Sequence, residues 1–150
     1  MMEEQGWSSE MALGVPAMDN AHRAFVAELN RLASAPDDRF AAGFHALIAS
    51  MERDFREEEE LMEAIGFPGV QAHSEQHARV LGGMHHAASR VMEGDLATGR
   101  GAVEFLQQWF RLHLSTMDLA LAVAIDLNDA EDSALQASRT DSPSPPQTGR

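Results

Sequence analysis

The chain has 150 residues, a length typical of one domain with its own apolar core. It contains no cysteine, which excludes disulfides, thiolate metal sites and cysteine nucleophiles. Its formal net charge of -13 argues against nucleic acid or an anionic membrane surface as a partner. The acidic start lacks the apolar segment of a signal peptide, and no stretch approaches the roughly 18 apolar residues of a membrane span. We therefore expect a cytoplasmic protein.

An irregular N-terminal arm is predicted for residues 1–17, because Pro16 argues against a helix there. Beyond the arm, apolar residues recur at helical spacing in four stretches, about 18–35, 38–65, 70–93 and 97–127. Turn-forming clusters that contain Pro36, Pro68 and Gly94 separate them. Four helices with short connections predict an all-α fold, an antiparallel up-down-up-down four-helix bundle.

The last stretch of the chain changes in composition. Residues 129–150 are polar, rich in serine and proline, and poor in apolar side chains. Such a segment cannot bury enough surface to offset its ordering entropy, so we predict a disordered tail. The expected organisation is a bundle over residues 1–128, followed by this tail.

Potential metal ligands occur on every predicted helix. They are His22 on the first, Asp54 and Glu58 on the second, His73 and His77 on the third, and His113 and Asp118 on the fourth. Residues four apart share one face of a helix, so the middle pairs can point into the bundle axis. His113 and Asp118 are five apart, a rotation of about 140°, and are not expected to bind one ion from one side. They can serve a site that holds two metals, and such ligands suit iron, manganese or zinc.

Three sequence motifs resemble those of one known family. The first is Leu13-Gly14-Val15 followed by Met18-Asp19 and His22. The second runs Asp54-Phe55-x-x-Glu58-Glu59-x-Leu61-Met62, then Gly66-Phe67-Pro68, then His73-x-x-x-His77. The third is Trp109-Phe110-x-x-His113-x-x-x-x-Asp118. Over roughly residues 7–120, the chain resembles the bacterial hemerythrins, which are non-haem di-iron proteins that bind dioxygen.

The resemblance implies a cofactor of two iron ions per chain. One iron would be held by the histidines His73, His77 and His113, and the other by His22. Glu58 and Asp118 would bridge the two irons, with an oxo or hydroxo group as the third bridge. Dioxygen would bind at the iron on the His22 side. The apolar pocket over that iron would be lined by Phe25, Phe55, Trp109, Phe110 and Leu114.

One position departs from the family pattern. Asp54 stands where the family has a histidine, four residues before the bridging glutamate. An anionic ligand stabilises ferric iron, so it should lower the reduction potential and promote autoxidation. Aspartate is also shorter than histidine, so it reaches the iron directly only if the helix moves inward, and otherwise through a water. The neighbouring Glu57, Glu59 and Glu60 are expected to face solvent, with Glu57 as a spare ligand.

Three functions are compatible with this sequence. The first is a dioxygen-binding protein for storage, delivery or sensing. The second is a di-iron oxidase or peroxidase acting on dioxygen, peroxide or nitric oxide, which Asp54 favours. The third is a metal-poor or differently metallated bundle that serves as an interaction or sensor module. The ligand types do not distinguish iron from manganese, and we expect a monomer.

Overall fold

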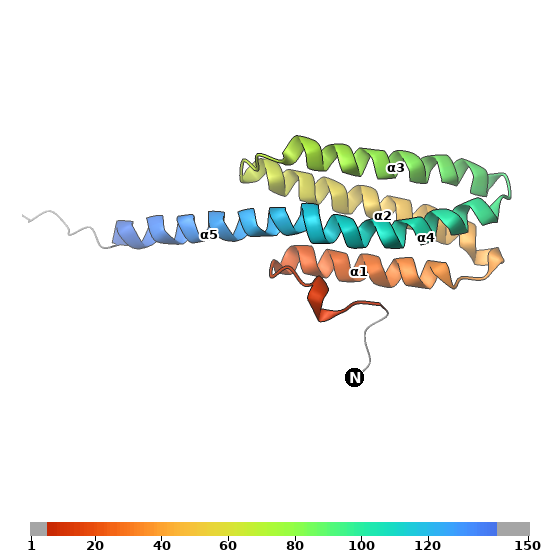
Figure 1. Ribbon diagram of the computed structural model, residues 1–150, viewed down its shortest axis with the longest axis horizontal. Helices are drawn as coiled ribbons and strands as arrows, with labels where there is room; N and C mark the ends of the chain where they lie inside the picture. The colour runs from red at the N-terminus through yellow and green to blue at the C-terminus, as the bar shows by residue number, and fades with distance from the viewer. Residues whose placement is uncertain (1–5, 141–150) are drawn as a thin grey trace, which may run out of the picture.

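A computed structural model describes residues 6–140 as an antiparallel arrangement of long helices. The elements are η1 (Ser9–Met11), α1 (Pro16–Ala33), α2 (Asp37–Ala64), α3 (Val70–Met92), α4 (Leu96–His113), the π-helical η2 (Leu114–Asp118) and α5 (Leu119–Thr140). The elements α4, η2 and α5 follow one another in a single rod, which is the fourth helix of the bundle (Figure 1). The predicted all-α four-helix bundle is therefore confirmed.

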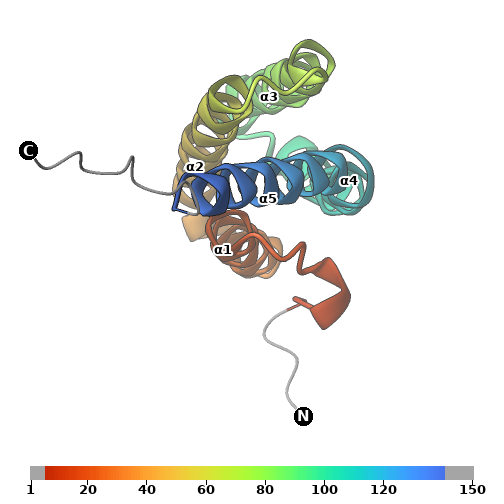
Figure 2. The ribbon, with the colours of Figure 1, turned by 90° about the vertical axis from the view of Figure 1, so that its left-hand side faces the viewer.

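The bundle forms because each helix buries a stripe of apolar residues against the others. Figure 2 views these helices nearly end-on. In α2, for example, Phe40, Phe44, Leu47 and Met51 recur at helical spacing and are all buried. Each such side chain contributes about 1.5–3 kcal/mol when it leaves water. A second, smaller apolar cluster around Met62 lies toward the other end of α2. Polar ligands that lie between these clusters are shielded from solvent on both sides.

The first helix begins at Pro16, so the expectation that this proline lies outside a helix was wrong. Proline is well tolerated at the first helical position, where its missing N–H would have had no intrahelical partner. The Asp19 carboxylate accepts hydrogen bonds from the backbone N–H groups of Leu13 (2.8 Å) and Gly14 (3.1 Å). These bonds fold the preceding segment back, and the Trp7 side chain packs into the core.

The fourth helix is longer than predicted. We expected it to end near residue 127 and a disordered tail to begin at 129, but α5 continues to Thr140. Figure 1 shows its distal part running past the ends of the other helices. Side chains 129–139 are exposed there. Alanine, leucine, glutamate, glutamine and arginine in this stretch favour a helix locally, and no proline interrupts them before residue 143.

The remaining part of the predicted tail, 141–150, lies outside the described residues, as do residues 1–5 of the arm. Among the described helices, none combines the length and the apolar character needed to cross a membrane.

Candidate metal centre

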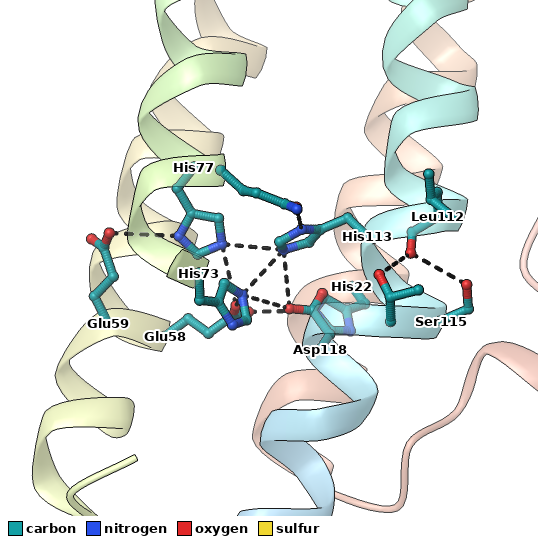
Figure 3. A network of polar contacts seen from close by, with 11 residues as sticks. His22, Glu58, Glu59, His73, His77, Leu112, His113, Ser115 and Asp118 are labelled. Carbon is teal, nitrogen blue, oxygen red and sulfur yellow. Dashed lines mark hydrogen bonds and ion pairs between the residues drawn. The ribbon is translucent and has the colours of Figure 1, made fainter. Parts of the chain in front are cut away.

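Three helices of the bundle bring five potential ligands to one buried point. The ligand atoms of Glu58, His73, His77, His113 and Asp118 all lie within 4.8 Å of one another. The Nε2 atoms of His73 and His77 are each 3.2 Å from Nε2 of His113 (Figure 3). Two ligands that bind one ion at about 2.1 Å and at right angles would be about 3 Å apart. The spacing therefore resembles the ligand shell of a metal.

Asp118 reaches this point because the fourth helix changes its winding. In the π-helical turn Leu114–Asp118, hydrogen bonds close over five residues, so residues five apart lie about one turn apart. His113 Nε2 is consequently 3.2 Å from Asp118 Oδ1. The expectation that His113 and Asp118 point to different sides assumed α-helical winding, and it was wrong. The hydroxyls of Ser115 and Thr116 donate to the Leu112 carbonyl beside this turn (Figure 3).

The two carboxylates divide their oxygens between two sides of the site. Asp118 Oδ1 lies 3.1 Å from Nε2 of His73, whereas Oδ2 lies 3.2 Å from Nε2 of His22. Glu58 Oε1 lies 2.6 Å from Nε2 of His73, whereas Oε2 lies 3.6 Å from Nε2 of His22. The arrangement thus has a three-histidine side, formed by His73, His77 and His113, and a His22 side. Both carboxylates face the two sides at once.

Comparison with known proteins agrees with this arrangement. Residues 13–125 match the family described as the hemerythrin HHE cation binding domain. The chain belongs to the hemerythrin family. Over 112 residues it is 38% identical to a bacteriohemerythrin of Ralstonia nicotianae, a match that covers 75% of this chain and 82% of the relative. Every histidine and carboxylate of the buried cluster lies within the matched hemerythrin region.

The atoms of this hemerythrin site fit a bound cation. Glu58 Oε1 and Asp118 Oδ1 are buried without a hydrogen-bond partner, although imidazole nitrogens surround them. Buried acceptors of this kind cost about 1–3 kcal/mol each, and more when charged, unless something satisfies them. A cation at the centre would satisfy both carboxylates and accept the lone pairs of the Nε2 atoms. The donor set, imidazole and carboxylate without thiolate, suits iron, manganese or zinc.

His22 and His73 hold protons at neutral pH in the absence of metal. Burial alone would lower the pKa of His22, but hydrogen bonds with Asp118 and Glu58 raise it to about 9. Burial would likewise lower the pKa of His73, but the neighbouring carboxylates of Asp118 and Glu58 raise it to about 9. Burial would raise the pKa of each carboxyl group, yet the histidines hold the pKa of both Glu58 and Asp118 below its usual range. A metal must therefore displace protons from this site.

Asp54 lies apart from the five-residue cluster. Its side chain is 21% exposed, and its Oδ1 is 3.5 Å from Nε of Arg53. Burial raises its pKa, and Glu57 adds to the rise, while Arg53 opposes it. Asp54 lines a cavity together with His22 and Glu58, so the structure places it beside the His22 side without direct contact to the cluster.

This cavity has a volume of about 100 Å³ and is lined mainly by apolar side chains. Of the predicted pocket residues, Phe25, Phe55 and Phe110 line it. Among the described residues that line this cavity, Trp109 and Leu114 are absent. The Trp109 ring instead stacks on His113, with centroids 4.5 Å apart and planes at 12°. Leu114 packs in the large apolar cluster.

Two residues behind the three-histidine side were not predicted from the sequence. Nδ1 of His113 donates to the side-chain oxygen of Gln76 at 3.0 Å. Glu59 was expected to face solvent, but its Oε1 lies 3.6 Å from Nδ1 of His77 (Figure 3). No motif pointed to either residue. The stacking of Trp109 on His113 was recognisable in principle, since residues four apart share a helix face.

Proposed function

We propose that this protein holds two iron ions per chain and uses them to bind dioxygen for storage, delivery or sensing. The observation that carries the proposal is the division of the Glu58 and Asp118 oxygens between the two sides of the site. Carboxylates that face two positions at once are suited to bridging a metal pair, as in other helix-bundle sites. A cluster built for one ion would not need His22 on the far side of both carboxylates.

Each side then has a distinct set of residues. His73, His77 and His113 would hold the first iron, and His22 would hold the second together with Asp54, directly or through a water. When bound, ferrous iron supplies the electron density that a dioxygen ligand requires. The protein excludes bulk water, keeps the imidazole Nε2 atoms directed at the centre, and provides the cavity beside His22. In this proposal the protein is cytoplasmic, and its acidity opposes self-association, which favours a monomer.

The cavity size supports a small ligand. The cavity volume of about 100 Å³ exceeds the space that a single water needs. Pockets for organic ligands are commonly about 300–1,000 Å³. Dioxygen, peroxide or nitric oxide would fit the space beside His22, whereas an organic substrate would not.

Asp54 supports a second candidate function, a di-iron oxidase or peroxidase that acts on dioxygen, peroxide or nitric oxide. The carboxylate lines the cavity next to His22, and an anionic ligand there would stabilise the oxidised metal. Because the ferric state would be favoured, a bound dioxygen or peroxide would tend to be reduced by the metal and not released unchanged.

Anaerobic reduction followed by exposure to air would test the proposal. Visible absorption and metal content should be followed together on protein expressed in iron-replete medium. Two irons per chain and an absorption band that disappears under vacuum would support reversible binding. Rapid conversion to a ferric spectrum that vacuum does not reverse would support the enzyme instead. Iron well below one per chain would contradict both and leave an interaction or sensor module, and manganese in its place would overturn the assignment of the metal.

A further inference from the structure

The three-histidine side is supported from behind by groups that do not belong to the ligand cluster. Gln76 lies on α3 immediately before His77, and its oxygen accepts the Nδ1–H of His113 from α4 at 3.0 Å. The opposite nitrogen of the same ring, Nε2, faces His73, His77 and Asp118. One amide thus links α3 to the only ligand histidine of α4.

The hydrogen bond determines which nitrogen of His113 carries the proton. An amide oxygen can only accept, so Nδ1 must donate, and in the neutral ring Nε2 then keeps its lone pair. A metal-ligating histidine needs that lone pair, and its second nitrogen is generally held by an acceptor that fixes the ring. Trp109 stacks on the same ring and limits its rotation. His113 is therefore already oriented as a ligand before a metal arrives.

His22 and His73 differ from His113 in this respect. The Nδ1 atoms of both rings are buried without a hydrogen-bond partner among the described residues. Nδ1 of His77 has only the Glu59 carboxylate nearby, at 3.6 Å, beyond hydrogen-bond distance. Among the described residues, Gln76 is thus the acceptor closest to the Nδ1 atom of any ligand histidine, and it is neutral.

We propose that Gln76 is a positioning residue that orients His113 and, through its lack of charge, keeps the reduction potential of the three-histidine metal high. An acceptor with a full negative charge would draw the Nδ1 proton more strongly and make the ring a more basic ligand. A more basic ligand stabilises the oxidised metal. The neutral amide offsets the tendency of Asp54, on the His22 side, to favour ferric iron. This inference rests on the proposed iron site.

The test compares Gln76→Glu and Gln76→Leu with the matched variants Gln71→Glu and Gln71→Leu. Gln71 lies on the same helix and is exposed, so its variants make the same chemical changes away from the cluster. Gln76→Glu is nearly isosteric, and it keeps the test informative if Gln76→Leu folds poorly. The measurements are the midpoint potential by spectroelectrochemistry, iron affinity by competition with a chelator, and the His113 tautomer by ¹⁵N NMR of the metal-free protein.

We expect Gln76→Glu to favour the oxidised metal at least tenfold relative to Gln71→Glu, a shift of about 59 mV for one electron. Gln76→Leu should weaken iron binding about 10–100-fold and release the tautomer preference of His113. Equal potentials for Gln76→Glu and Gln71→Glu, or an unchanged tautomer in Gln76→Leu, would overturn the proposal while leaving the iron site intact. A wild-type protein that binds no iron would instead remove the proposed function on which it rests.

Discussion

His73, His77 and His113 are almost fully buried, aromatic rings stack on His77 and His113, and an amide also holds the His113 ring from behind. Across the same two carboxylates, His22 is a single histidine, and it lines a cavity together with the half-buried Asp54. In the proposed iron site, one side would thus keep a metal and the other would leave space for a ligand. Rigid coordination and access to the metal would be divided between the two halves.

The carboxylates that join the halves give the largest expected effect. Glu58→Ala removes an oxygen from each side and leaves histidines that repel one another when protonated. We expect this variant to lose both irons, measured by elemental analysis after chelator-free purification. The exposed neighbour Glu60 provides the control, and Glu60→Ala should retain both. If Glu58→Ala retained two irons per chain, the two sides of the site would not depend on a shared bridging carboxylate.

Removing a histidine from one side should separate the halves. His22→Ala should keep the iron of the three-histidine side, lose the other, and abolish dioxygen binding. His77→Ala should weaken the first iron instead, because it deletes one of its three imidazoles. Iron content and absorption in air distinguish the two variants. If His22→Ala bound dioxygen as the wild type does, the assignment of the ligand to that side would be contradicted.

Asp54→His is a test of the His22 side alone. It replaces the anionic side chain beside the cavity with a neutral ring of greater reach. We expect the reduced protein to autoxidise more slowly, at least tenfold, and to hold dioxygen longer, measured by stopped-flow absorption. Glu57→Gln provides a control for charge at the cavity rim. Equal autoxidation rates for the wild type and Asp54→His would mean that Asp54 does not influence the metal.

The smallest effect concerns pH and the metal-free protein. His22 and His73 have folded-state pKa values raised to about 9, so their contribution to stability is complete below about 6.5 and is lost as pH rises through 9. For one such histidine the loss is about 3 kcal/mol. The chain has no lysine, tyrosine or cysteine to titrate in this range.

Urea unfolding of metal-free protein should therefore show lower stability at pH 10 than at pH 7, and His22→Gln should reduce the difference. The metal-loaded protein should lack this loss, since its histidines are already deprotonated. A flat profile for the metal-free wild type would show that protons do not occupy the site.

Much of this architecture could be predicted from sequence because helices repeat at short range. The spacing of Phe44, Leu47 and Met51 identifies a buried face, and His73 and His77 share one by the same rule. The π-helical turn before Asp118 could not be predicted from spacing, because the α-helical rotation gives the opposite answer. Gln76 and Glu59 were missed because their roles depend on contacts between helices. The end of α5 was misjudged because composition was weighed above local helix propensity.

Anaerobic titration of metal-free protein with ferrous iron tests the central claim most directly. We expect saturation at two irons per chain in the wild type and at one in His22→Ala. The affinity for the iron that remains in His22→Ala should be within about tenfold of its affinity in the wild type. Saturation at one iron in both proteins would contradict it, since Glu58 and Asp118 would then close a single site and His22 would not be a ligand.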